Sequence, residues 1–452
     1  MKARRFWLCV MVMAFMVFAA MNSGCGGSSS SSSSETQTVT SGDQSGNNGG
    51  TTSNDQTGNN GGDTTSNDQT VTGDTYSTTT AGSHALSLTD GSSATYSNIT
   101  VTKTGDATGS SDGTSGYDWT GSNAAVFASG GSTLTITGSS TNITSNATGG
   151  NAVFAYGGNL NGSNSGDGTT ITISDAAITT SKNNSGGIMV TGGGGINASS
   201  LTITTSGGSS AAIRSDRGGG TMTVSGGTYT TNGTGSPAIY STSAVTGSDV
   251  TLKSNVAQVV VIEGGNSVTL TGSSLTANHT TLNGKDTTHQ AVLIYQSMSG
   301  DASDGSSSFS MTNGSITNAQ GDIFCITNTT CSVSLSSVGI TNNDTSGNFL
   351  RAAGQNWGTS GRNGGNVTLN ASGQTISGNM LVDSSSSLTL NLKDSSTFSG
   401  AINPSGQTGT VNVVVEEGSA WTLTGNSYVT SFTNNGTLNK GSYNLYVNGT
   451  AQ

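Results

Sequence analysis

Residues 259–270 decide the fold: they read Val-Val-Val-Ile-Glu-Gly-Gly-Asn-Ser-Val-Thr-Leu. The wholly apolar run Val259–Ile262 is followed by a glycine turn and then by Val268-Thr269-Leu270, in which apolar and hydroxyl-bearing residues alternate. Alternation with a period of two is typical of a β-strand that buries one face. Two short strands joined by a tight turn therefore predict a small repeating β unit.

The same unit recurs along the chain. A second, apolar strand precedes most of the alternating runs, and a weaker third strand often follows. The alternating runs are Leu134–Ile136, Ile171–Ile173, Leu201–Ile203, Met222–Val224, Val250–Leu252, Val268–Leu270, Phe309–Met311, Val333–Leu335, Val367–Leu369, Leu388–Leu390 and Trp421–Leu423. Glycine accounts for 69 of 452 residues, and no apolar stripe with helical spacing persists. The repeat predicts an all-β fold, a single-stranded right-handed parallel β-helix of about eleven coils.

The first 25 residues have the features of an export signal. Lys2, Arg4 and Arg5 precede the apolar run Phe6–Met21, which is too short to span a bilayer comfortably. The run ends at Asn22-Ser23-Gly24-Cys25, which is similar to the lipidation site of bacterial lipoproteins, although Asn22 departs from the aliphatic residue usual there. We expect Cys25 to carry lipid and to anchor an exported protein at the cell envelope, at the outer membrane or the cell surface.

Three segments follow from these patterns: a signal peptide at 1–25, a disordered linker rich in Ser, Gly, Asn and Thr at 26–79, and a β-helix at 80–452 that ends in a cap. The chain has 13 basic and 24 acidic residues, a net charge of −11. This balance argues against nucleic acid and anionic lipid headgroups as ligands. Contact with the membrane is expected through the N-terminal lipid.

Two cysteines, Cys325 and Cys331, remain in the predicted β-helix. In an exported protein they either form a disulfide or stay as free buried thiols, and spacing alone leaves both alternatives open.

Larger side chains mark one surface of the predicted β-helix. Where the apolar strands are aligned, the residue after the last buried position should point outward. In successive coils this position gives Arg214, Tyr240, Glu263, Tyr295 and Arg351. Aromatic rings stack on sugar rings and charged groups bond to hydroxyls, so this pattern favours a polysaccharide ligand. A solvated face with a few large residues is the alternative.

The longest predicted insertions, 157–168, 298–307 and 354–365, occupy one position in the coil and should project from one edge. Asp216 and Arg217 lie at that edge, as do Trp357 and Arg362, and all four are candidate ligand-binding residues. Asp301 and Asp304 in the second insertion are candidate calcium ligands, because carboxylate oxygens suit that ion. No cofactor is otherwise required by the sequence, and no catalytic motif is present, so a catalytic residue is not assigned.

The chain resembles a family of bacterial exported, adhesin-like, carbohydrate-binding β-helix proteins with a pectate-lyase-like architecture. The resemblance rests on the segments 212–220, 293–301, 347–353, 421–425 and 445–449. It implies a surface protein that binds polysaccharide or a host-surface ligand and that is not an enzyme. A calcium-dependent polysaccharide lyase and a structural envelope stalk are the alternatives.

Overall fold

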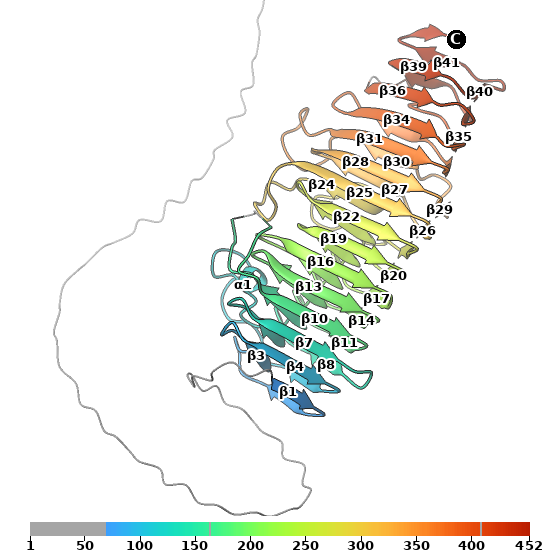
Figure 1. Cartoon of the computed structure of the whole chain (residues 1–452). Coiled ribbons are helices and arrows are strands. Elements are labelled where there is room, and N and C mark those ends of the chain that lie inside the picture. Colours follow the sequence, from blue (N-terminus) through green and yellow to red (C-terminus); the bar gives the residue numbers. More distant parts are fainter. Residues whose placement is uncertain (1–68, 162–163, 407–408) are drawn as a thin grey trace, which may run out of the picture. The chain divides into compact units, whose positions relative to one another are not determined.

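The computed structural model describes residues 69–161, 164–406 and 409–452, and this part of the chain is almost entirely β-structure. Long parallel sheets run along a stack of coils, with their strands in sequence order (Figure 1). The predicted all-β, parallel β-helix class is confirmed. The signal peptide, Cys25 and most of the predicted linker lie outside the described residues. Within the described part, no helix has the length and apolar character needed to cross a membrane.

Sheet A forms the longest wall and has 14 strands, all paired in parallel. These strands alternate between buried apolar and outward polar residues, as the sequence pattern requires. They are β1 (Gln69–Thr72), β4 (Ser93–Ser97), β7 (Thr133–Thr137), β10 (Thr170–Ser174), β13 (Gly194–Ser199), β16 (Gly220–Ser225), β19 (Ala244–Ser248), β22 (Ser267–Thr271), β25 (Ser306–Thr312), β28 (Thr329–Ser336), β31 (Gly365–Ser372), β34 (Ser387–Lys393), β36 (Thr410–Val415) and β39 (Ser431–Asn434).

Sheet B follows sheet A in each coil, and sheet D takes its place in the last coils. Sheet B contains β2 (Thr75–Thr78), β5 (Thr100–Lys103), β8 (Asn142–Ser145), β11 (Ala177–Thr180), β14 (Thr202–Thr205), β17 (Thr228–Thr231), β20 (Thr251–Ser254), β23 (Ser274–Ala277), β26 (Ser315–Asn318) and β29 (Gly339–Asn342). Sheet D contains β32 (Thr375–Ser377), β35 (Thr397–Ser399), β37 (Ala420–Thr422) and β40 (Thr437–Asn439).

Sheet C completes each coil, and most of its strands are buried on both faces. It contains β3 (Leu86–Leu88), β6 (Val126–Ala128), β9 (Val153–Tyr156), β12 (Ile188–Thr191), β15 (Ile213–Ser215), β18 (Ile239–Ser241), β21 (Val260–Glu263), β24 (Gln290–Tyr295), β27 (Asp322–Thr327), β30 (Leu350–Ala352) and β33 (Met380–Val382). At the C-terminal end, β38 (Ser427–Val429), β41 (Leu445–Val447) and β42 (Thr450–Ala451) form sheet E, whose last pair is antiparallel.

The turn from sheet A to sheet B is short and uses the left-handed backbone conformation. Asn98, Asp175, Asp249 and Asn313 have φ between 54° and 58° at this turn. Asn and Asp tolerate this conformation better than most residues, because their side chains bond locally to the backbone. These turns keep sheets A and B in constant register, so insertions are confined to the connections on either side of sheet C.

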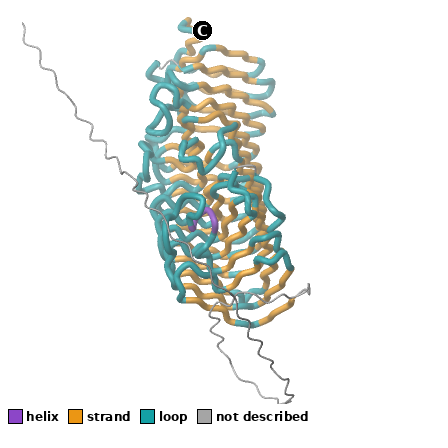
Figure 2. Tube along the Cα trace, turned by 90° about the vertical axis from the view of Figure 1, so that its left-hand side faces the viewer, coloured by secondary structure: helices purple, strands orange, loops and turns teal. Residues whose placement is uncertain are grey.

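One apolar core runs inside the coils from Leu86 to Leu445. Two smaller clusters lie outside it, against the outer face of sheet C, and loops cover that face. In Figure 2 the single described helix, α1 (Tyr117–Thr120), lies among these loops. The outer face of sheet C is therefore the one wall where loops and side chains build a second layer, whereas sheets A and B present Ser, Thr and Asn to solvent.

The structure corrects three details of the predicted repeat. Sheet A has 14 strands where about eleven coils were expected, and the β-helix begins by Gln69 rather than at residue 80. The first coils were missed because β1 and β2 carry few apolar residues and acquire their conformation by pairing with β4 and β5. The alternating runs Leu201–Ile203 and Val250–Leu252, grouped with those of sheet A by their pattern, belong instead to sheet B.

Cys325 and Cys331 are free, buried thiols, so the disulfide alternative is not the one observed. Cys325 on β27 packs outside sheet C against Leu293 and Tyr295, whereas Cys331 on β28 points into the core. One side chain thus lies outside sheet C and the other lies inside the coil, on the inner face of sheet A. Burial raises the pKa of both thiols to about 12.

Candidate ligand-binding cleft

The outer face of sheet C carries one column of mostly apolar side chains, and Arg214 lies in the middle of it. Phe127, Phe154 and Met189 form a cluster on one side. Backbone pairing places Arg214 next to Met189, and Tyr240 next to Arg214. Val261, Leu293 and Cys325 continue the column on the far side. A cation at this position needs partners from outside the sheet, because its neighbours in the column supply none.

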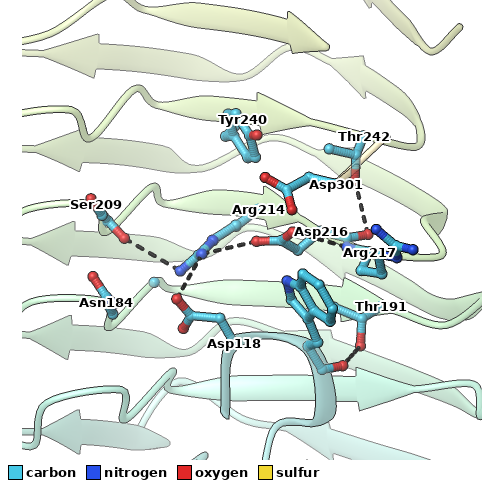
Figure 3. Close-up of polar contacts among 12 residues, drawn as sticks. Asp118, Asn184, Thr191, Ser209, Arg214, Asp216, Arg217, Tyr240, Thr242 and Asp301 are labelled. Carbon is cyan, nitrogen blue, oxygen red and sulfur yellow. Dashed lines mark hydrogen bonds and ion pairs between the residues drawn. The ribbon is translucent and has the colours of Figure 1, made fainter. Parts of the chain in front are cut away.

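Those partners are two aspartates that share one nitrogen of the guanidinium group (Figure 3). Arg214 Nη2 lies 3.1 Å from Asp118 Oδ2 and 3.0 Å from Asp216 Oδ2. Arg214 Nη1 donates to the backbone carbonyl of Ser209 at 3.3 Å. Asp216 follows β15 directly, whereas Asp118 comes from α1, far earlier in the chain. The side chains of all three residues are at most 10% exposed.

Burial and the neighbouring charges perturb this group strongly. Burial raises the pKa of Asp216 to about 8, with Arg214 opposing the rise and Asp301 and Asp118 adding to it. Burial also raises the pKa of Asp118, again against the effect of Arg214. For Arg214, burial alone would lower the pKa, but the two carboxylates outweigh it and hold that pKa above its ordinary value.

Close packing positions α1, and with it Asp118. The helix ends at Gly121, whose φ of 70° is left-handed and suits glycine. A Cβ atom at this position would lie 2.7 Å from the ring of Phe154 and 2.8 Å from that of Phe127. The short helix can therefore rest directly on the apolar cluster only because residue 121 has no side chain.

Beside Arg214, the carboxyl group of Glu263 forms hydrogen bonds with two tyrosines of the neighbouring coils. Its Oε2 accepts hydrogen bonds from Tyr240 Oη at 2.5 Å and from Tyr295 Oη at 2.8 Å. Its Oε1 accepts from the hydroxyl of Ser297. Glu263 has no exposed surface, and burial raises its pKa against these hydrogen bonds. Because both tyrosine hydroxyls donate to the same oxygen, the carboxyl group fixes both rings.

The same network orders the loop that follows β24. Ser299 Oγ lies 2.7 Å from Ser297 Oγ, the donor to Glu263, and itself donates to Asp301 Oδ2 at 2.8 Å. The backbone carbonyl of Gly300 accepts from Arg217 Nη1, and Arg217 Cζ stacks over the ring of Trp119, 4.9 Å from its centroid. These contacts tie Asp301 to the Arg214 group, and Figure 3 shows Asp301 beside Asp216.

The Arg214 group, the two tyrosines and Asp301 line a cleft of about 320 Å³ on the outer face of sheet C. A smaller recess adjoins it at Tyr240 and Tyr295 and reaches Trp357, whose ring packs edge-on to Tyr295 with 4.7 Å between centroids. The wall of the main cleft is formed by Ser111, Asp112, Asp118, Asn184, Ser209, Ala211, Arg214, Asp216, Gly235, Pro237, Tyr240, Asn283, Tyr295 and Asp301. A concave site with aromatic rings and convergent polar groups is the usual form of a small-ligand site.

The predicted outward ladder is correct in its face but wrong in its register. Glu263 pairs with Tyr295, while Tyr240 pairs with Val261, so Glu263 lies two residues further along the strand than Tyr240. The ladder therefore comprises two columns, which the Glu263 hydrogen bonds connect. Its members were also expected to be exposed, but Glu263 is fully buried and Tyr295 is 7% exposed, because loops cover the face.

Two predicted ligand-binding residues lie away from the cleft. Arg351 belongs to the same outer column but several coils further on, beside Cys325, where its Nε is 2.6 Å from Asp322 Oδ2. Arg362 is exposed on the loop between β30 and β31 and does not line the cleft. The coil spacing of a solenoid separates residues that the sequence pattern had grouped together.

The two candidate calcium ligands differ in position. Asp301 lines the main cleft, whereas Asp304 is exposed and accepts a hydrogen bond from Gln296 Nε2 at 2.8 Å. Among the described residues, no three His, Cys, Asp or Glu side chains are grouped so as to hold a metal ion. The calcium site therefore remains a prediction without structural support.

Sequence reasoning missed the contribution of α1 and of the connections that enter sheet C. Asp112, Asp118, Asn184 and Asn283 all reach the cleft from these connections. The one available signal was Tyr117-Asp118-Trp119, an aromatic pair in a stretch otherwise rich in Gly, Ser and Thr. Nothing in the sequence indicates that this segment packs beside Arg214.

No protein-family model, curated protein or solved structure matches this chain. The resemblance to adhesin-like β-helix proteins therefore stays a prediction, and the cleft has to be interpreted from its own chemistry.

Proposed function

We propose that this protein is a lipid-anchored binding protein of the cell surface that recognises polysaccharide through the cleft on sheet C. The observation that carries the proposal is the cleft itself, where Tyr240 and Tyr295 adjoin Asp216 and Arg214 on the outer face of sheet C. Aromatic surface suits the apolar faces of sugar rings, and carboxylate and guanidinium groups suit their hydroxyls. The adhesion role and the anchor at Cys25 rest on the sequence pattern alone.

The geometry gives no specific support to the lyase alternative. A lyase acting on uronate chains needs a free cation or base near the substrate. Arg214, the one cation that lines the cleft, is committed to two aspartates at 3.1 and 3.0 Å. We therefore place binding ahead of catalysis.

The proposal is tested by screening the full chain, with its N-terminal signal removed, against an array of soluble plant and bacterial polysaccharides. We expect Tyr240→Ala to reduce binding at least tenfold. Tyr443→Ala is the matched control, because Tyr443 is 40% exposed near the C-terminal end and lies outside the cleft. Melting curves of both variants establish that they fold. Absence of binding to every glycan, or equal binding by the two variants, would overturn the proposal and favour a structural stalk.

A further inference from the structure

The cleft has more acidic than basic side chains. Four aspartates line it, Asp112, Asp118, Asp216 and Asp301, against the single cation Arg214. The guanidinium group is already shared by two of them, so Asp112 and Asp301 face the cleft without a cationic partner lining it. Arg217 does not compensate: its guanidinium contacts Gly300, Leu160 and Trp119 instead.

One carboxylate oxygen within this group has unused bonding capacity. Asp118 Oδ1 is buried and makes no hydrogen bond, although Oδ2 of the same group is paired with Arg214. The amide of Asn151 lies close enough to lower the pKa of Asp118, but its own Nδ2 also completes no hydrogen bond. The nearest donor to this oxygen is therefore the Asn151 amide inside the protein, and the free edge of the carboxyl group adds negative charge behind the wall of the cleft.

The neighbouring aromatic residues accept cations. Lys285 Nζ lies 5.4 Å from the centroid of the Trp357 ring, in the recess that adjoins the cleft. Tyr240 and Tyr295 line both spaces, so a ligand in the cleft meets aromatic side chains and carboxylates together. Carboxylates combined with aromatic rings form the chemical environment in which proteins hold ammonium groups.

We infer that the cleft selects polysaccharide units that carry a free amino group, such as glucosamine, over N-acetylated and uronate units. This inference rests on the proposed function and adds the class of sugar. An ammonium group donates up to three hydrogen bonds and brings a positive charge to the four carboxylates. A uronate brings a further negative charge, and an N-acetyl group brings none.

Because Asp216 titrates near neutral pH, proton release on binding provides a second test of this selectivity. Because burial raises the pKa of Asp216 to about 8, a large share of this side chain is protonated at neutral pH. The groups that face it are Arg214, Asp118 and Asp301, with Arg217 bonding through its backbone N–H. A cation bound beside Asp216 stabilises the ionised form, so binding should release a proton.

The experiment compares glucosamine, N-acetylglucosamine and galacturonate oligomers of equal length by calorimetry at about pH 6, where the amino group is protonated. We expect glucosamine oligomers to bind at least tenfold more tightly than the other two, with an affinity that falls as salt is added. Repeating the titration near neutral pH in buffers of different ionisation enthalpy measures the released proton.

Asp301→Asn removes one carboxylate from the cleft, and Asp304→Asn is the matched control in the same loop, because Asp304 does not line the main cleft. We expect Asp301→Asn to weaken glucosamine binding about tenfold and Asp304→Asn to leave it unchanged. Equal or tighter binding of the N-acetylated or uronate oligomers, or no effect of Asp301→Asn, would overturn the inference while the proposed function stands. Failure of every glycan to bind would overturn both.

Discussion

Asp118 Oδ2 and Arg214 Nη2 lie 3.1 Å apart although 96 residues separate them in the chain. This contact joins the loop that carries α1 to the outer face of sheet C, and Asp216 completes the group from the other side. The pair is buried beside an apolar column, where an ion without its partner is expensive.

Replacing Arg214 by Met should be strongly destabilising, because it leaves Asp118 and Asp216 buried without their cation. We expect the free energy of unfolding to fall by about 3–5 kcal/mol. Chemical denaturation monitored by circular dichroism measures this change. Arg351→Met is the control on the same sheet face. The Arg351 side chain is 27% exposed, so its replacement should lower the free energy of unfolding less. Equal losses in the two variants would show that the buried group has no special role.

Glu263→Gln should weaken ligand binding more than it weakens the fold. The amide has one oxygen in place of two and cannot accept all three hydroxyl donors as the carboxylate does, so Tyr240 and Tyr295 lose their fixed positions. We expect a loss of stability of about 1–2 kcal/mol together with at least a tenfold loss of glycan affinity. Denaturation and calorimetry on the same sample separate the two effects. Unchanged affinity would mean that the tyrosines do not contact the ligand.

Gly121→Ala should displace α1 from its apolar support without touching the cleft. The added methyl group would meet Phe154 at 2.7 Å in a backbone conformation unfavourable for alanine. We expect a loss of stability of about 1–3 kcal/mol and weaker binding through displaced Asp118. Gly441→Ala is a suitable control, because its φ of 56° is also left-handed but no atom lies within 4 Å of the added Cβ. A similar effect on binding in both variants would rule out positioning by α1.

Lys103→Met should stabilise the protein at neutral pH. Lys103 is fully buried on β5, its Nζ donates to the Thr80 carbonyl at 3.3 Å, and burial lowers its pKa to about 8. A lowered lysine pKa means that the folded state prefers the neutral amine, so stability is lost as the pH falls from about 10.5 through 8. We expect Lys103→Met to gain about 2 kcal/mol at pH 7 and almost nothing near pH 10.5. Denaturant titrations at both pH values test this, and a gain independent of pH would contradict it.

Cys325 and Cys331 should resist alkylation in the native protein. Both thiols are buried, and their raised pKa of about 12 leaves very little thiolate at pH 8. Mass spectrometry after iodoacetamide treatment should find neither residue modified until denaturant is added, when both should react. Failure of the two to react after unfolding without reductant would reveal a disulfide instead.

The sequence by itself determined the repeat, because strand alternation and glycine turns are local properties that the apolar and Thr residues of β10, β16 and β22 display directly. It also indicated the face that holds the cleft, since large side chains such as Arg214 and Tyr295 are rare in this chain. The sequence could not assign each strand to its sheet, because the residues around Thr202 in sheet B have the same alternating pattern as those around Thr172 in sheet A.

Only the tertiary structure decided the composition of the cleft. Whether Glu263 is exposed or buried depends on loops that no local pattern places, and Asp118 reaches Arg214 because α1 packs on Phe127 and Phe154. The sequence also could not show that Cys325 points out of the coil while Cys331 points into the core, because this depends on the sheet to which each strand belongs. Contacts between distant parts of the chain form where burying several segments together lowers the free energy of the folded state. This total depends on all of the segments, so no single segment of the sequence reveals it.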